Sequence, residues 1–401
     1  MDTPKARTAS WLIPLALTIG LAIVAVGALL TVVSSNQPLH PNPEAVPSAM
    51  LSTPAPEWTR AVAQGRLIAR TALTEQNLPG LSVAVGLAGE VVWAEGFGWA
   101  DLESRTAVDP RTRFRIGHVS KSLTSVGVGL LREQGRLHLD EEIHTYVPAF
   151  PRKEWPMTLR QLMGHMAGVR HYRDTEWGDK LTAHCDRAAD GLKSWADGPL
   201  LFKPETEYRY STYGWVLVSA AVEATASTPF FQFMRSEVFE PMGMVDTEED
   251  LVSVSLPNRA TSYYRANFGN EITTDVDYSC FAGAGAFLST PSDLVRFASA
   301  LADGTFLQPA TVGLLQAPQT LATGASTDYG LGWMLETVEL GGEPTRVVGH
   351  ASRTIEGASV SFLTFPDRGL IVAVTANMSF ADMKSVAMGV AKVFSERAVE
   401  Q

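Results

Sequence analysis

The sequence is poor in cysteine and has no concentrated positive charge. Its two cysteines, Cys185 and Cys280, are far apart and do not have the spacing of metal ligands. They permit a disulfide in a domain outside the cytoplasm, although two buried free thiols are the simpler expectation. The net charge is −11 with histidine neutral, and lysine and arginine form no run longer than a pair. The chain therefore lacks the basic face that nucleic-acid binding needs.

Metal-binding patterns and a common hydrolase motif are also missing. The eight histidines form neither a His-x-His nor a His-Glu-x-x-His pattern, so we expect no metal ion and no cofactor. Residues 357–361 begin like a nucleophile elbow but end in serine where that motif needs glycine. An ordinary α/β-hydrolase is therefore not indicated.

One long apolar run is present, at residues 11–33. Its 23 residues are uncharged; as a helix they would reach roughly 34 Å, enough to cross a hydrocarbon core of about 30 Å. The apolar region of a secretory signal is shorter, about 7–15 residues, so we predict an uncleaved transmembrane anchor. Lys5 and Arg7 precede the run and the next basic residue is Arg60. The positive-inside bias then places residues 1–10 in the cytoplasm and the rest outside it, on the periplasmic side in a bacterium.

The segment after the apolar run has the composition of a linker. Residues 34–56 contain six prolines and few apolar side chains. Such a composition is typical of an extended, semi-rigid connection. We therefore expect the globular domain to span residues 57–401.

Within that domain, strand-like segments stand at both ends and helical patterns between them. Residues 80–101 form two apolar runs around a turn at 88–89, as in a hairpin. Residues 212–226 are typical of a helix, and residues 289–304 have a capping residue, a first-turn proline and a terminal glycine. Further strand-like runs follow at residues 329–340, 357–366 and 369–378, before a helix at 381–399. This order predicts one sheet built from both chain ends, with a helical region inserted.

Four phrases, in this order, resemble the serine β-lactamase and D-Ala-D-Ala peptidase superfamily, in its class C-like, β-lactamase-related branch. They occupy residues 144–155, 164–172, 202–215 and 282–301. The amino-acid sequences of these segments are more similar to those of mitochondrial β-lactamase-like serine proteases than to those of typical penicillin-recognising enzymes. The resemblance implies an α+β, β-lactamase/transpeptidase-like fold, in which an antiparallel sheet flanked by helices meets a helical region at about residues 117–285. The active site of such proteins lies between the two.

The resemblance also implies three short sequence boxes around the site. The first is Ser-x-x-Lys at a helix N-terminus, where the serine attacks an acyl carbon and the lysine, on the same helix face, accepts its proton. Here the box is His118-Val119-Ser120-Lys121, at the start of a helix predicted to end at Gly135. No other frame places a serine three residues before a lysine. His118 therefore occupies the nucleophile position beside the expected catalytic Lys121.

The second box supplies a tyrosine that relays protons to and from the leaving group. It reads Tyr210-Ser211-Thr212, so the tyrosine is present and Thr212 replaces the commoner asparagine. On the resemblance, Tyr210 is a catalytic residue and Thr212 a substrate-binding one.

The third box, Lys-Thr-Gly or His-Thr-Gly, lies on the strand at the edge of the site. At positions 350–352 this chain has His-Ala-Ser, which keeps the histidine and loses the glycine. Since glycine permits close approach of a substrate to the strand, Ser352 and Arg353 are expected to crowd it. The backbone N–H of Arg353 is the expected second donor of the oxyanion hole. His350, Ser352 and Arg353 are thus the predicted substrate-binding residues.

Two of the three boxes lack a residue that acyl transfer in this superfamily uses: the serine nucleophile of the first and the glycine of the third. We therefore predict a membrane-anchored pseudoenzyme that binds a peptide, a cell-wall fragment or an acyl ligand. Two alternatives remain: an active serine peptidase or esterase-like hydrolase with a rearranged site, and a structural or assembly protein with a vestigial site. In a purely structural role Lys121 would pair with an acidic side chain, and His165 and His171 are expected to be structural.

Overall fold

The computed structural model describes residue 21 and residues 38–173, 183–251, 256–266, 269–273, 276–354, 356–357 and 359–399. The predicted anchor at 11–33 lies outside these residues except for Leu21. No helix in the described ranges has both the length and the apolar character needed to cross a bilayer.

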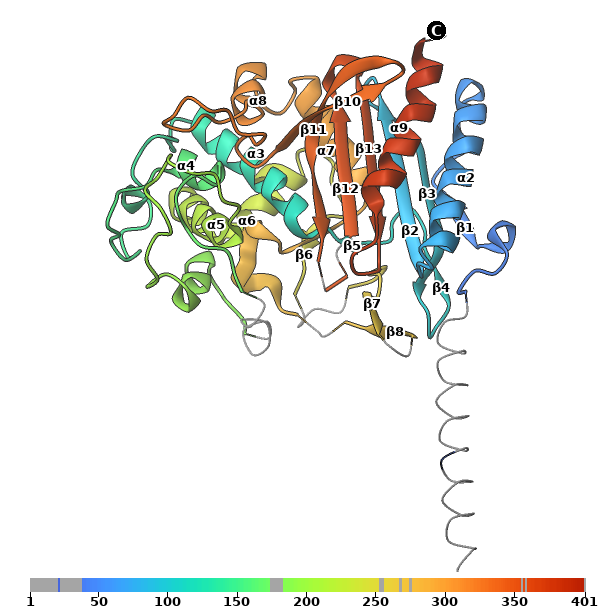
Figure 1. The fold of residues 1–401 in the computed structure, drawn as a ribbon, viewed down its shortest axis with the longest axis horizontal. Helices are drawn as coiled ribbons and strands as arrows, with labels where there is room; N and C mark the ends of the chain where they lie inside the picture. The colour runs from blue at the N-terminus through green and yellow to red at the C-terminus, as the bar shows by residue number, and fades with distance from the viewer. Residues whose placement is uncertain are drawn as a thin grey trace, which may run out of the picture.

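A sheet of eight strands organises the domain (Figure 1). Its strands follow the order β1-β3-β2-β13-β12-β11-β10, β4 pairs with β3, and neighbouring strands are antiparallel. Their bounds are β1 Ser48–Met50, β2 Gly80–Leu87, β3 Glu90–Asp101, β4 Thr106–Ala107, β10 Met334–Leu340, β11 Glu343–Arg353, β12 Ser359–Phe365 and β13 Leu370–Ala376. Leu87 lies opposite Leu370 where β2 pairs with β13. The prediction of one sheet made from both chain ends is confirmed.

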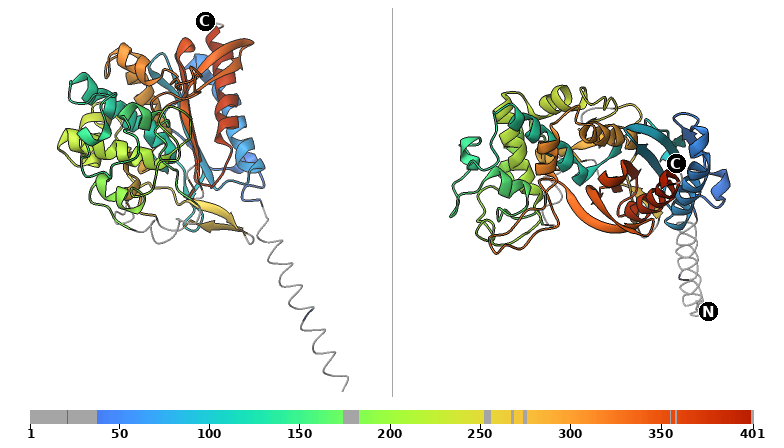
Figure 2. Two further views of the ribbon diagram at one scale, coloured as in Figure 1. Left: turned by 60° about the vertical axis from the view of Figure 1, so that its left-hand side comes forward. Right: turned by 90° about the horizontal axis from the view of Figure 1, so that it is seen from above.

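Helices cover both faces of this sheet (Figures 1 and 2). On one face α2 (Thr59–Glu75) packs beside α9 (Met383–Val399), and on the other α7 (Pro291–Ala302) crosses β2 and β13. The core under α9 is aromatic: the ring of Phe394 stacks on Trp58 and Trp93, with centroids 5.8 and 5.9 Å away. Because β2 and β13 are buried on both faces, their sequences are nearly continuous apolar runs.

The helical region lies beside the face that carries α7 (Figure 2). Its α-helices are α3 Ser120–Glu133, α4 Leu159–Met163, α5 Thr212–Ala226, α6 Phe230–Phe233 and α8 Pro309–Leu315, and its shorter helices include η3 Gly117–Val119, η7 Ala188–Ser194, η8 Met234–Phe239 and η9 Tyr278–Ala284. Two small sheets complete the fold, one of β5 Phe114–Arg115, β6 Glu248–Glu249 and β9 Phe287–Ser289, the other of β7 Tyr263–Ala266 and β8 Gly269–Ile272. The first twelve residues of α5 are buried, and the helix packs against α3, α4, α6, η7 and η9.

Local signals fixed several helix ends as predicted. α5 spans the predicted residues, and its N-cap Ser211 accepts a hydrogen bond from the Gly214 N–H. α7 begins with Pro291 after the N-cap Thr290. α3 ends just before Gly135, whose φ of +68° favours glycine.

The start of the domain differs from expectation. Within the segment expected to be a linker, β1 pairs with β3. His40 and Val46 are buried, and the Nε2 atom of His40 lies 3.0 Å from the carbonyl oxygens of both Leu78 and Pro79. Prolines are compatible with this packing because β1 is an edge strand. The folded domain therefore includes residues from His40 onward.

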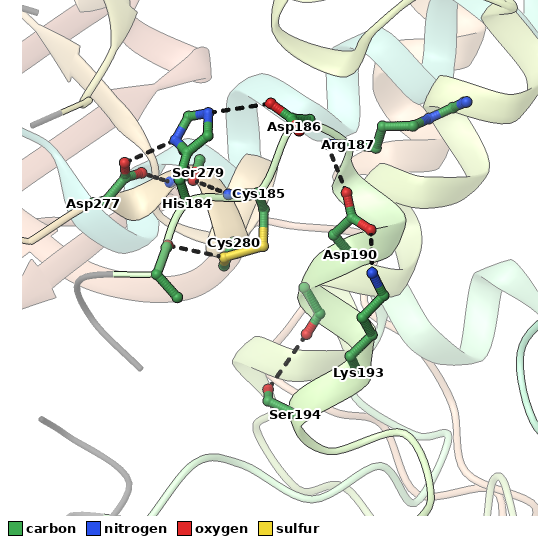
Figure 3. Close-up of a disulfide and its surroundings, with 12 residues drawn as sticks. His184, Cys185, Asp186, Arg187, Asp190, Lys193, Ser194, Asp277, Ser279 and Cys280 are labelled. Atoms are coloured by element: carbon green, nitrogen blue, oxygen red, sulfur yellow. Dashed lines mark hydrogen bonds and ion pairs between the residues drawn. A yellow bond between two sulfur atoms is a disulfide. The ribbon is translucent and has the colours of Figure 1, made fainter. Parts of the chain in front are cut away.

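The expectation of two free thiols is wrong. Cys185 and Cys280 form a disulfide across 95 residues, which joins the segment before η7 to η9 (Figure 3). Beside it, Asp277 accepts hydrogen bonds from the Ser279 N–H and from His184. Two cysteines 95 residues apart pair only if the fold brings them together, and their spacing in the sequence does not predict that.

Candidate active site

His118 and Lys121 lie where η3 passes into α3. Gly117 has a φ of +46°, a backbone conformation that suits glycine, and permits the turn from β5 into this helix. His118 and Lys121 are three residues apart, so both side chains emerge on one side of the helix. Lys121 is fully buried, and its Nζ atom donates to the backbone oxygen of Ala284 in η9 at 2.7 Å. His118 is only partly buried.

Tyr210, just before α5, is the centre of the site. Its ring centroid lies 4.3 Å from that of His165, 5.5 Å from that of His118 and 6.5 Å from that of His350. The Nζ atom of Lys121 is 5.2 Å from the same centroid. The hydroxyl of Tyr210 is buried and has no hydrogen-bond partner among the described residues. The structure thus brings together the key residues of the three predicted boxes.

The third box is split between the two faces of β11. His350 is buried; its Nδ1–H donates to the Ala351 oxygen at 2.9 Å, so its Nε2 accepts from the Tyr329 hydroxyl at 3.0 Å. Ser352 faces the same side of the strand as His350. Arg353 alternates to the other side, is exposed, and donates to the Phe380 oxygen at 2.6 Å. Its side chain therefore does not crowd the His350 side.

Sequence reasoning undervalued two histidines and missed one tyrosine. The Nδ1 atoms of His165 and His171 accept the N–H groups of Ser211 and Thr212, each at 3.1 Å, and so fix the start of α5. Both are therefore structural, as expected, but their rings also face Tyr210. Both histidines lie in residues 164–172, one of the four segments that carry the resemblance, and that membership was a signal that they belong to the site. Tyr329 belongs to no motif, and nothing in the sequence pointed to it.

We call these residues the histidine cluster: His118, Lys121, His165, His171, Tyr210, Tyr329 and His350. Four of the eight histidines of the chain belong to it. No described carboxylate forms an ion pair with any of its basic groups, and the partner of Lys121 is a backbone carbonyl rather than an acid. Within the described ranges, no three His, Cys, Asp or Glu side chains are arranged to hold a metal ion.

Burial disfavours the charged forms of the bases in the histidine cluster. It lowers the pKa of Lys121 far below 10.5. Burial, with added repulsion from Lys121 and the neighbouring histidines, lowers the pKa of His118 and His165 well below 6.5. By the same two causes the pKa of His171 falls to about 4 and that of His350 to about 3. At neutral pH the four histidines are therefore neutral.

The hydroxyl groups near Lys121 on α3 do not replace the missing serine. Those of Ser122 and Thr124 donate to the backbone oxygens of Gly332 and Gly283, at 2.8 and 3.0 Å. Ser120 is fully buried, and as the immediate neighbour of Lys121 it cannot share its helix face. The only side chain one turn before Lys121 is therefore an imidazole.

Comparison with known proteins identifies the class. The family model described as Beta-lactamase matches residues 66–393, so the chain belongs to that family. The human serine beta-lactamase-like protein LACTB, mitochondrial, is 26% identical over 450 residues, covering 86% of this chain and 82% of the relative. Penicillin-binding protein 4* of Bacillus subtilis (strain 168) is 26% identical over 280 residues, covering 66% of this chain and 60% of the relative.

Solved structures confirm the fold. A penicillin-binding protein from Bacillus halodurans superposes with a TM-score of 0.68 at 22% identity, covering 83% of this chain and 99% of the other. EstCE1, a hydrolase with promiscuous acyltransferase activity, gives a TM-score of 0.69 at 19% identity, covering 84% and 98%. The resemblance inferred from four sequence phrases is therefore confirmed for the family and for the α+β fold.

Proposed function

We propose that this member of the Beta-lactamase family has lost acyl transfer by a serine nucleophile and keeps the histidine cluster as a binding site for a peptide, a cell-wall fragment or an acyl ligand. The identity of residue 118 carries this proposal. Lys121 has the burial and the lowered pKa of a proton acceptor, but the side chain one turn before it is the imidazole of His118, which has no hydroxyl proton to give.

A histidine nucleophile is less well supported. A side-chain nucleophile works with a base, and that base is oriented by a third group. No described residue forms a hydrogen bond with the ring of His118, and no described carboxylate pairs with Lys121. The ring also reaches further than a serine side chain, into the space where the substrate carbonyl would lie.

The test compares four forms of the full chain, the wild type and three variants, with a fluorophosphonate probe, a fluorescent penicillin and a chromogenic ester. We expect no labelling and negligible hydrolysis by the wild type, and detectable labelling with poor turnover by His118→Ser, since one box alone is restored. Rates above about 10³–10⁴ times that of water need a nucleophile. Hydrolysis by the wild type that His118→Ala abolishes would show that His118 reacts, and the proposal would fail. His138→Ala, outside the cluster, is the matched control.

One observation favours the alternative of an active hydrolase with a rearranged site. The hydroxyl of Ser352 is buried, has no partner among the described residues and faces the same side of β11 as His350. If the wild type is labelled, Ser352→Ala separates the two candidates: loss of labelling would identify Ser352 as the nucleophile.

We further propose that residues 11–33 anchor the domain outside the cytoplasm. The uncharged run with basic residues only on its N-terminal side supports this orientation. The disulfide between Cys185 and Cys280 also supports it, because such bonds persist in oxidising compartments. A reporter fused after Gln401 should work only if its activity requires export, and activity of a cytoplasm-only reporter would reverse the orientation.

A further inference from the structure

Three buried groups of the histidine cluster have hydrogens that find no acceptor among the described residues. His165 is 2% exposed, and because its Nδ1 accepts the Ser211 N–H, its Nε2 carries a proton; that nitrogen has no partner among the described residues. The buried hydroxyl of Tyr210 has none either. Lys121 uses one hydrogen on Ala284 and has at least one left. Each of these groups can donate, so the group that completes the site is an acceptor.

The ionisable groups around His118 include no acid among the described residues. The ionisable groups that face it from the neighbouring elements are Lys121 of α3, His165 and His171 of the loop after α4, Tyr210 before α5, and His350 of β11. All are bases or a tyrosine. The acid Asp328 acts on Tyr208, which is 40% exposed and lies outside the cluster. A site whose buried donors lack partners, and which no described acid faces, favours a negatively charged ligand.

Only one of the four histidines is free to take up a proton without losing a hydrogen bond. His165 and His171 each accept a backbone N–H through Nδ1, and His350 accepts the Tyr329 hydroxyl through Nε2. Protonation would break each of these bonds. His118 makes no hydrogen bond with the described residues and is partly exposed, so it can both gain a proton and reach a ligand from solvent.

We propose that the histidine cluster binds an organic oxyanion, with Lys121, Tyr210 and His165 as donors, and that His118 takes up one proton when the anion binds. The proposal rests on the proposed function, because the site must be open to a ligand that is not consumed. Tyr210 is partly exposed and its ring packs edge-to-face on Tyr329, so an aryl or other apolar group on the anion can lie beside it. His118 is neutral without ligand, so the bound negative charge stabilises its imidazolium form.

Isothermal titration of the full chain with benzenesulfonate tests this directly. The sulfonate stays ionised throughout, and it cannot acylate the protein, so its failure to bind is distinct from a failure of the labelling test. We expect binding that tightens up to about tenfold for each unit that the pH is lowered between about pH 8 and pH 6, the slope for uptake of one proton. Titrations in buffers of different ionisation heat should give an uptake of about one proton.

Matched ligands and variants complete the design. Neutral benzenesulfonamide should bind at least about tenfold more weakly, and Tyr210→Phe should weaken sulfonate binding about tenfold. His118→Gln should bind without proton uptake, and His138→Gln should match the wild type. Thermal unfolding of each variant shows that it is folded; if Tyr210→Phe is not, the ligand comparison alone decides. Absence of binding, equal binding of both ligands or binding independent of pH would overturn the proposal, and uptake that persists in His118→Gln would overturn the role of His118.

Discussion

The two sides of the central sheet bury different kinds of side chain: packed aromatic rings on one side, and polar groups without hydrogen-bond partners among the described residues on the other. Under α9, the rings of Trp58, Trp93 and Phe394 stack in an apolar layer, and the Trp93 indole N–H donates to Glu95. At the other side, where β11 meets η3, the buried groups include several bases, and the donors on Tyr210 and His165 have no partner in the described part of the chain. Buried polar atoms without partners cost stability, whereas packed aromatic rings contribute to it. The difference supports the proposal that the first region holds the fold together and that the second binds a ligand.

The largest expected effect is a loss of stability from a substitution in the aromatic layer under α9. Phe394→Ala removes a fully buried ring that touches both tryptophans, and we expect it to lower the free energy of unfolding by about 3–5 kcal/mol. Chemical denaturation measures the change. At a temperature where the variant is folded, its benzenesulfonate affinity should be that of the wild type, because Phe394 lies on the opposite face of the sheet. A loss of less than about 1 kcal/mol would contradict the assignment of this layer as the main core.

The second effect is acid lability centred on the histidine cluster. The pKa of His350 is about 3 in the folded protein, and its ordinary value is 6.5. The unfolded state thus binds the proton first, so the stability from neutral His350 is complete above about pH 6.5 and is lost as the pH falls toward 3. At pH 5 the loss from this group is about 2 kcal/mol.

Comparing His350→Gln with the wild type isolates this contribution. The amide still offers an acceptor to Tyr329 but does not titrate, so the decline in stability between about pH 7 and pH 5 should be smaller by about 2 kcal/mol. Denaturant unfolding at each pH measures it. His138→Gln, at an exposed position outside the cluster, should decline as the wild type does. Parallel declines of His350→Gln and the wild type would refute the buried neutral state.

Features written in local sequence were predictable, and those that depend on tertiary packing were not. α5 and α7 were placed by apolar runs and capping residues, and the boxes by the resemblance to the β-lactamase-related branch. The disulfide between Cys185 and Cys280, and the place of Tyr329 beside His350, arise from segments that meet only in the fold. The strand β1 was hidden because an edge strand tolerates the prolines that suggested a linker.

The smallest expected effect concerns Lys121, and it sharpens the contrast between the regions. Its amine is fully buried, burial lowers its pKa far below 10.5, and it has one carbonyl partner. Lys121→Met keeps the length of the side chain and removes the buried base, at the loss of one hydrogen bond worth about 1 kcal/mol. We expect a net gain in the free energy of unfolding of roughly 1 kcal/mol near neutral pH.

The pH dependence of that gain distinguishes an unpaired buried lysine from a paired one. Because burial lowers the pKa of the folded lysine, the unfolded state binds more protons at any pH between that lowered pKa and 10.5. The wild type therefore becomes more stable as the pH rises through this range, and the advantage of Lys121→Met shrinks. Unfolding of both proteins at about pH 7 and about pH 9 measures this difference. A lysine paired with a buried acid would behave in the opposite way, because the variant would then lose about 3–5 kcal/mol by leaving that acid without its partner. Such a loss would mean that the histidine cluster already holds its counter-charge, and an added anion would have no place there.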